Sequence, residues 1–302
     1  MTSPEEALAA INGVYGVHAG RRAFHAKGVI CHAEFVATPR AAELTRAAHM
    51  SGERIWTTAR FSNGGGNPNV ADYMPDTRGL ATSFHLPDGE RTDILAQILP
   101  LFPFKDPEAF IDALHAGHFS PASLVRFPVL AARNPRLLLT MPANLKAMFT
   151  VPASFAALTY VPFHAFKWID AEGGERWIRY YWKPTVNEPT LSRRAARRRG
   201  PDYLFEELRA RLEREPVRMD LEVQIAGPGD DPHDPSSAWP DDRERVVVGT
   251  LEVAAIDDEA DDSIVFDPMR LTAGIEPSDD PVLLYRPPVY DLSYKHRAGA
   301  GS

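Results

Sequence analysis

Hydrophobic and polar residues follow two different spacings along the chain. Apolar positions recur with helical period in several segments and alternate, or cluster as β-branched and aromatic runs, in others. The helical spacing predicts helices at residues 4–18, 107–119, 121–148 and 202–213. The strand-like composition predicts strands at residues 29–36, 53–62, 82–86, 217–225 and 246–253. Two aromatic segments on either side of Gly173 and Gly174 predict a hairpin over residues 163–184.

The segment after Arg286 combines a helix signal with a chemical one. Pro287 and Pro288 suit the first turn of a helix, where a missing N–H leaves no bond unmade, so a short helix is expected to begin at Arg286. Arg286 and Tyr290 are then four residues apart on one helix face. A guanidinium beside a phenol stabilises the phenolate, which can bind a metal ion. The alternative is an ordinary surface pair on a terminal helix.

Composition narrows the class of protein. The 302 residues carry a net charge of −8, which argues against a nucleic-acid surface. No signal-peptide pattern and no apolar run of about 20 residues is present, so we expect a cytoplasmic protein with no membrane partner. A single cysteine, Cys31, agrees with a reducing compartment and excludes a Cys-rich metal site.

Four motifs carry a resemblance to a known family. The run F-D-P-x5-G-I-E-P-S-x-D-x2-L-x2-R-x3-Y, from Phe266 to Tyr290, resembles the proximal segment of haem catalases. The run R-x2-H-A-K-G beginning at Arg22 resembles their distal segment, and R-F-S at Arg60 resembles a third. H-A-F-K at His164 resembles a fourth. The motifs occur in the family's order along nearly the whole chain.

The resemblance implies an α+β fold in which a catalase-like antiparallel β-barrel is surrounded by helices and binds haem. It implies one domain over residues 1–302, without the long N-terminal arm, the wrapping segment and the C-terminal domain of larger catalases. Haem b is the implied cofactor, with Tyr290 as the ligand of its iron.

The resemblance also assigns roles to individual residues. His25 becomes the distal acid–base catalyst, because a neutral imidazole can take a proton from one peroxide oxygen and return it to the other. Ser62 is expected to hydrogen-bond this imidazole and fix its tautomer. The remaining cofactor-binding residues are Arg22, Arg60, Phe110, His164, Arg286 and Arg297, of which Arg22, Arg60 and Arg297 are expected at the haem propionates. Phe110 is equally compatible with an ordinary core position, and His164 receives no catalytic role.

Two positions depart from the family pattern. An ungapped match of Asp93 to Asp106 puts Ile98 where catalases have a distal asparagine. Gly64 falls where they have a valine in the access channel, and its missing side chain is expected to widen the approach. Both departures favour an alkyl peroxide over hydrogen peroxide, since Ile98 offers apolar surface and no hydrogen bond.

We therefore expect a haem-dependent peroxidase that reduces organic hydroperoxides, and also hydrogen peroxide, with a separate electron donor through a ferryl intermediate. A true catalase, a non-enzymatic haem-binding protein and an enzyme that rearranges fatty-acid hydroperoxides are the alternatives. The expected partners are a small-molecule peroxide and an electron donor. A homo-oligomer stays open, and the donor and the physiological peroxide are not encoded in any motif.

Overall fold

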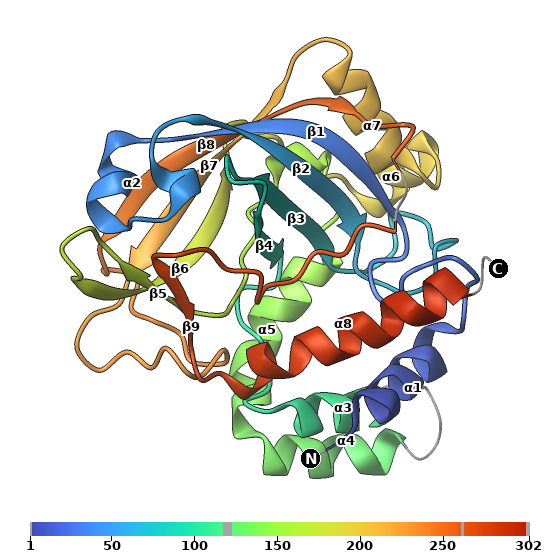
Figure 1. Cartoon of the computed structure of the whole chain (residues 1–302). Coiled ribbons are helices and arrows are strands. Elements are labelled where there is room, and N and C mark those ends of the chain that lie inside the picture. The colour runs from blue at the N-terminus through green and yellow to red at the C-terminus, as the bar shows by residue number, and fades with distance from the viewer. Residues whose placement is uncertain (1, 117–122, 261–262, 300–302) are drawn as a thin grey trace.

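The computed structural model describes residues 2–116, 123–260 and 263–299. A curled antiparallel sheet forms the body of the molecule, and helices gather at its sides (Figure 1). The strand order is β4-β3-β2-β1-β8-β7-β6-β5-β9. The strands are β1 Gly28–Ala37, β2 Arg54–Asn63, β3 Arg78–His85, β4 Arg91–Gln97, β5 Phe166–Ile169, β6 Glu175–Pro184, β7 Val217–Ile225, β8 Arg245–Ile256 and β9 Ile275–Pro277.

The curl of this sheet makes a half-barrel with a packed interior. The strands pair in antiparallel fashion, and β1 lies between β2 and β8 near the middle of the sheet. The largest buried side chains, which include Trp168, Trp182 and Phe35, belong to one hydrophobic core cluster. The α+β class with a catalase-like antiparallel architecture is thus confirmed, in the form of a half-barrel with β4 and β9 as edge strands.

Helices cover two sides of the half-barrel. In Figure 1, α1, α3, α4, α5 and α8 gather on one side, and α6 and α7 lie at the opposite end. The helices are α1 Pro4–Tyr15, α2 Pro39–Leu44, α3 Pro107–Ala116, α4 Ser123–Arg133, α5 Pro135–Phe149, α6 Arg193–Arg199, α7 Tyr203–Leu212 and α8 Pro281–Gly299, with 3₁₀ turns at Ala48–Met50 and Phe155–Ala157. Over the described ranges, none of these helices combines the length and apolar character that crossing a bilayer requires.

Most predicted elements are present, with shifted limits. The first helix ends at Tyr15 because Gly16 takes a φ of +81°, outside the helical region. The long helix predicted at 121–148 is two helices that meet at Asn134, and the part of these predictions that covers 117–122 lies outside the described residues. Strands β4 and β9 were missed. The central residues of β4 are buried in succession, so its sequence lacks alternation, and β9 has only three residues.

The prediction that a helix begins at Arg286 was wrong. Helix α8 begins five residues earlier and contains Pro287 and Pro288 in its interior. Two contacts secure the turn before these prolines. The Asp280 carboxylate accepts the backbone N–H of Val282 at 2.8 Å, and the Tyr285 hydroxyl donates to the backbone of the N-terminal segment. The helix therefore tolerates two missing hydrogen bonds that would end a less anchored helix.

Candidate active site

Helix α8 presents Arg286 and Tyr290 on one face, as the four-residue spacing predicts. Arg286 donates to the Tyr290 hydroxyl from Nε at 2.9 Å and from Nη2 at 2.5 Å. Both donors belong to a permanently charged group, so the Tyr290 oxygen accepts two charge-assisted hydrogen bonds. The pair can thus supply an anionic oxygen ligand held in fixed geometry.

His164 fixes the other end of the Arg286 guanidinium. Its Nε2 lies 2.9 Å from Arg286 Nη1, and its Nδ1 lies 2.6 Å from Asp280 Oδ2. Because a guanidinium can only donate, Nε2 must accept, and Nδ1–H therefore donates to Asp280. Burial lowers the pKa of His164, and the charge of Arg286 adds to that effect, which keeps the ring in the neutral form this bonding needs.

Asp280, His164, Arg286 and Tyr290 thus form one chain of hydrogen bonds, called here the proximal chain. Asp280 and His164 are buried, with side-chain exposures of 0% and 1%. The same Asp280 carboxylate caps α8, so the start of the helix and the orientation of His164 depend on one residue. His164 is hydrogen-bonded to Arg286, which is in turn hydrogen-bonded to Tyr290. His164 therefore supports the expected haem ligand through Arg286.

On the distal side, His25 lies just before strand β1. Its Nδ1 is 2.9 Å from Ser62 Oγ, so the expected contact is present. The backbone of His25 is held by Gly64, whose carbonyl accepts its N–H at 2.9 Å. His25 adopts a φ of +56°, which a non-glycine residue rarely takes and which is typical of functional positions. We call His25 and Ser62 the distal pair.

Positively charged residues from both the distal and the proximal side of the site act on the His25 imidazole. Burial lowers its pKa to about 3, and the positive charges of Arg60, Arg286 and Arg22 contribute in that order. The influence of Arg286 shows that the proximal chain lies within electrostatic reach of the distal imidazole. His25 is therefore neutral at physiological pH and can accept a proton.

The three arginines expected at the propionates lie on segments around this region. Arg60, on β2, donates to the carbonyl of His25 at 3.0 Å. Arg22 donates to the carbonyl of Ile264, and Arg297, on α8, donates to the neighbouring Ser263 carbonyl at 3.0 Å. Positions 263 and 264 are adjacent, so Arg22 and Arg297 meet at one loop. The structure thus groups two guanidinium groups there and a third beside His25.

Phe110, on α3, belongs to a group of aromatic rings next to the distal pair. Its ring centroid lies 5.3 Å from Phe102, 6.2 Å from Phe104 and 6.2 Å from Phe24, which precedes His25 in the chain. Phe163 adds a further ring at 5.3 Å from Phe102. Phe104 is buried and the other four rings are partly exposed, so the segment that precedes His25 borders an apolar group of rings.

Glycines make room for the charged and catalytic groups. A Cβ at Gly79 would come within 2.7 Å of His25 Cε1 and 2.9 Å of Ser62 Oγ, so only glycine allows this approach of β3 to the distal pair. A Cβ at Gly64 would lie 1.7 Å from Thr77 Oγ1. The expectation that Gly64 widens the access channel was therefore wrong, because the missing side chain makes room for Thr77.

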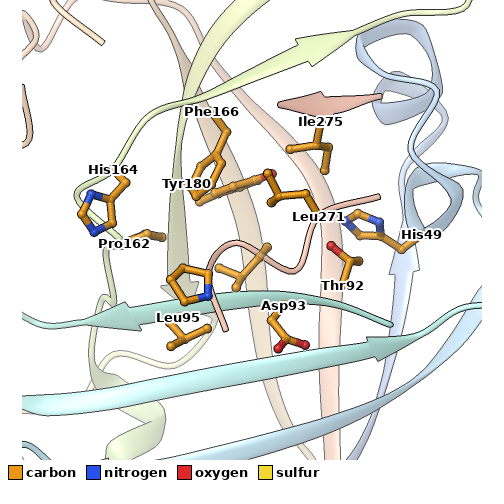
Figure 2. Close-up of a pocket in the computed structure, with 12 residues that line it drawn as sticks. His49, Thr92, Asp93, Leu95, Pro162, His164, Phe166, Tyr180, Leu271 and Ile275 are labelled. Atoms are coloured by element: carbon orange, nitrogen blue, oxygen red, sulfur yellow. The ribbon is translucent and has the colours of Figure 1, made fainter. Parts of the chain in front are cut away.

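The interior of the half-barrel holds a separate small cavity of about 10 Å³, shown in Figure 2. His49 and Thr92 lie on one side of it and His164 on the other (Figure 2). Burial lowers the pKa of His49 to about 3, so this ring is neutral. The space suits one water molecule, and His164 of the proximal chain forms part of its lining.

The donor set fits a haem group. An anionic oxygen from Tyr290 suits ferric iron, and guanidinium groups suit the two carboxylates of the porphyrin. His25 and Ser62 supply a proton acceptor with a fixed ring. The site residue that sequence analysis left without a role is Asp280, although it stands in the quoted motif. The sequence feature that could have identified Asp280 is an acidic residue directly before the proline at which a helix begins.

Comparison with known proteins identifies the family of the chain. The catalase family model matches residues 18–302. A catalase-related peroxidase of Mycolicibacterium paratuberculosis is 45% identical over 98% of this chain and 95% of its own length. Another catalase-related peroxidase, from Synechococcus elongatus, is 35% identical over 98% of this chain and 88% of its own.

The chain matches larger members of the family over only part of their length. The chain is 28% identical to a catalase of Pseudomonas aeruginosa and spans 57% of that protein. The crystal structure of a fungal catalase superposes with a TM-score of 0.81 at 21% identity, covering 97% of this chain and 62% of that one. The chain belongs to the catalase family. Within it, the chain groups with the catalase-related peroxidases, which it matches over nearly their whole length.

Proposed function

We propose that this peroxidase of the catalase family uses haem b to reduce organic hydroperoxides to alcohols, and that it also accepts hydrogen peroxide. The reaction consumes one hydroperoxide, two electrons and two protons, and it yields one alcohol and one water. The electrons come from a separate donor. Bound haem supplies the iron that accepts the peroxide oxygen and passes on the electrons. Tyr290 holds the iron, and Arg22, Arg60 and Arg297 hold the carboxylates.

The observation that carries this proposal is the distal pair, a neutral histidine whose Nδ1 is bonded to Ser62. With Nδ1–H donated to Ser62 Oγ, the lone pair stays on Nε2 and is available to the incoming hydroperoxide. His25 takes the proton from the oxygen that attacks and returns it to the oxygen that leaves as alcohol. A protein that only stores haem has no use for this proton transfer.

The preference for organic hydroperoxides rests on the apolar character of the approach. Ile98 is half-buried against the main core and has no side-chain group that can hydrogen-bond a second peroxide. The aromatic group that contains Phe24, Phe102 and Phe110 adds apolar area close to His25. An alkyl or aryl group gains about 25 cal/mol for each Å² it buries there.

The cellular setting is part of the same proposal. We propose one haem-binding domain that works in the cytoplasm, where Cys31 stays reduced. Cys31 is buried and free, and burial raises its pKa to about 12, so the thiol is inert. The electron donor is a small reductant or protein, and self-association is left open by the surfaces described.

Turnover measurements test the function directly. Haem-loaded protein is assayed with cumene hydroperoxide, tert-butyl hydroperoxide and hydrogen peroxide, with and without a reducing co-substrate, while oxygen release is followed in parallel. We expect donor oxidation with the two organic hydroperoxides to exceed oxygen release from hydrogen peroxide. Rapid oxygen release together with no turnover of cumene hydroperoxide would instead identify a true catalase.

The role of Ile98 has its own test. Ile98→Asn restores a polar side chain at this place and is expected to raise oxygen release from hydrogen peroxide while lowering the rate with cumene hydroperoxide. The matched control is Ile98→Leu, which keeps the apolar character. Equal oxygen release from both variants would remove residue 98 from substrate selection.

A further inference from the structure

Helix α5 has its apolar side turned outward. Leu138, Pro142, Leu145 and Phe149 follow the spacing i, i+4, i+7 and i+11, and all four are exposed. Leu139, at the edge of this face, is 79% exposed, and Phe149 is 56% exposed. We call these five residues the α5 stripe. Surface helices of folded proteins normally turn such a stripe toward the core.

Two of the three buried positions of the same helix carry polar side chains. The buried residues of α5 are Leu137, Thr140 and Asn144, and the Asn144 amide donates to the Leu101 carbonyl at 3.1 Å. A helix that places Thr and Asn inside and Leu and Phe outside has the reverse of the usual amphipathic pattern. An apolar surface of this kind marks an interaction site.

The segment that carries the α5 stripe is positively charged, although the chain as a whole is acidic. No Asp or Glu occurs between Asp112 and Asp170, although the net charge of the chain is −8. Lys146 lies between members of the stripe in sequence, and Arg133 ends the preceding helix; both are exposed. Arg136 is paired with Asp234 and adds less. Acidic residues nearest in sequence, such as Asp112, belong to α3, which packs on α4.

We propose that the α5 stripe docks on an anionic phospholipid bilayer, with α5 lying in the plane of the interface. Leu138, Leu145 and Phe149 enter the acyl boundary, while Lys146 and Arg133 stay at the level of the phosphates. This combination of exposed Leu and Phe with flanking cations is the pattern of helices that lie on membranes. Docking of this kind needs no membrane-spanning segment. The proposal replaces the expectation that the protein has no membrane partner.

Charge disfavours a second copy of the chain as the occupant. A two-fold contact through the α5 stripe would bring each Lys146 and Arg133 toward the same residues of the other copy. The sequence between Asp112 and Asp170 contains no carboxylate that could compensate them, and Asp234, which contacts α5, has a buried side chain that is already paired with Arg136. A bilayer rich in acidic headgroups matches both the apolar and the cationic character.

Docking on a membrane is independent of the proposed reaction, so a binding assay tests it without a measurement of activity. Full-length, haem-loaded protein is floated with vesicles of phosphatidylcholine, with or without phosphatidylglycerol. We expect binding to the vesicles that contain phosphatidylglycerol, weakened by added salt, and little binding to phosphatidylcholine alone. Absence of binding to both kinds of vesicle overturns the proposal and leaves the peroxidase assignment untouched.

Variants locate the contact. Replacing Leu138, Leu145 and Phe149 by Gln is expected to lower partitioning by about tenfold or more, because each loses a buried apolar side chain. Lys146→Gln, a single mild change, is expected to lower it about fivefold, which corresponds to about 1 kcal/mol. The control Val247→Gln changes an exposed apolar residue of β8 and should bind as the wild type does.

Two further results would contradict the docking surface. Unchanged partitioning of both the triple variant and Lys146→Gln places the contact elsewhere. A wild-type dimer that becomes monomeric in the triple variant, by light scattering, assigns the α5 stripe to self-association. Far-ultraviolet circular dichroism and turnover of cumene hydroperoxide, both expected at wild-type levels, show that the variants are folded.

Discussion

The two sides of the candidate site are built in opposite ways. The proximal chain is closed: Asp280 and His164 are buried, and each bonds the next member on the way to Tyr290. The distal pair is more open, since His25 is partly exposed and its ring is hydrogen-bonded to Ser62 through Nδ1, which leaves Nε2 as the acceptor. A rigid chain suits holding a ligand in one place, whereas a proton carrier needs an accessible nitrogen. The difference assigns cofactor retention to one side and proton transfer to the other.

The largest expected effect is on the proximal side. Tyr290→Phe removes the oxygen that Arg286 stabilises, and we expect the purified variant to lose haem or to bind it through another ligand. Absorbance spectra and haem content measure the loss. The control Tyr181→Phe, on β6, should keep a full load. A full load with an unchanged spectrum in Tyr290→Phe would show that this residue is not the ligand.

The next effect separates the distal side from haem binding. His25→Ala should keep haem yet slow peroxide cleavage by about 10²–10⁴-fold, the usual contribution of a general acid–base catalyst. Stopped-flow absorbance after mixing with cumene hydroperoxide measures the rate. His25→Asn is the matched variant, because asparagine tolerates the left-handed φ of +56° at this position. Cleavage at the wild-type rate in both variants would exclude His25 from the mechanism.

Asp280→Asn tests whether the charge of the proximal chain matters beyond its shape. Asparagine removes the buried negative charge and keeps one acceptor oxygen in place of two, so it can cap α8 at Val282 or accept from His164 Nδ1–H, but not both. We expect haem affinity to fall by about 10–100-fold, as for other groups that orient a metal ligand. Asp279→Asn is the control, since that neighbour is 94% exposed. Equal affinities for the two variants would reduce Asp280 to a helix cap.

Ser62→Ala should have a smaller effect than any of these. It removes one hydrogen bond of about 1 kcal/mol, so the cleavage rate should fall about fivefold with haem content unchanged. The same stopped-flow assay applies, and Ser62→Thr, which keeps the hydroxyl, is expected to recover part of the rate. A loss as large as that of His25→Ala would mean that Ser62 itself transfers the proton.

The smallest expected effect is the change of the peroxide cleavage rate with pH. The pKa of His25 is about 3, so the imidazole stays neutral from pH 5 to 8 and the rate should show no step near 6.5. Because this pKa is lowered on folding, its contribution to stability is present above pH 6.5 and is lost as the pH falls toward 3. Rates measured across this range check the first point, and a rate that halves near pH 6.5 would contradict it.

Sequence alone predicted two contacts of the candidate site, Arg286 with Tyr290 and His25 with Ser62, better than the limits of the elements that carry them. The spacing of Arg286 and Tyr290 gives their contact on any helix, so the error in where α8 begins did not affect it. The contact of His25 with Ser62 follows from the pairing of Gly28 with Ser62 in β1 and β2, which local patterns do not show. It was expected only through the family resemblance.

Other features depend on tertiary contacts that no local pattern reveals. Asp280 acts on His164, 116 positions away in the chain. Gly64 was predicted to widen the access channel because the sequence does not show that the Thr77 side chain occupies the space beside it. Strand β4 exists through its pairing with β3 rather than through its own alternation.

The products of cumene hydroperoxide test the account most directly. Cleavage assisted by His25 moves both electrons of the O–O bond together and yields 2-phenyl-2-propanol, whereas one-electron cleavage yields an alkoxyl radical that fragments to acetophenone. Chromatography of a reaction containing haem-loaded wild-type protein and excess donor gives the ratio of the two. The account predicts the alcohol as the main product, at one per hydroperoxide consumed. Acetophenone as the main product would contradict it.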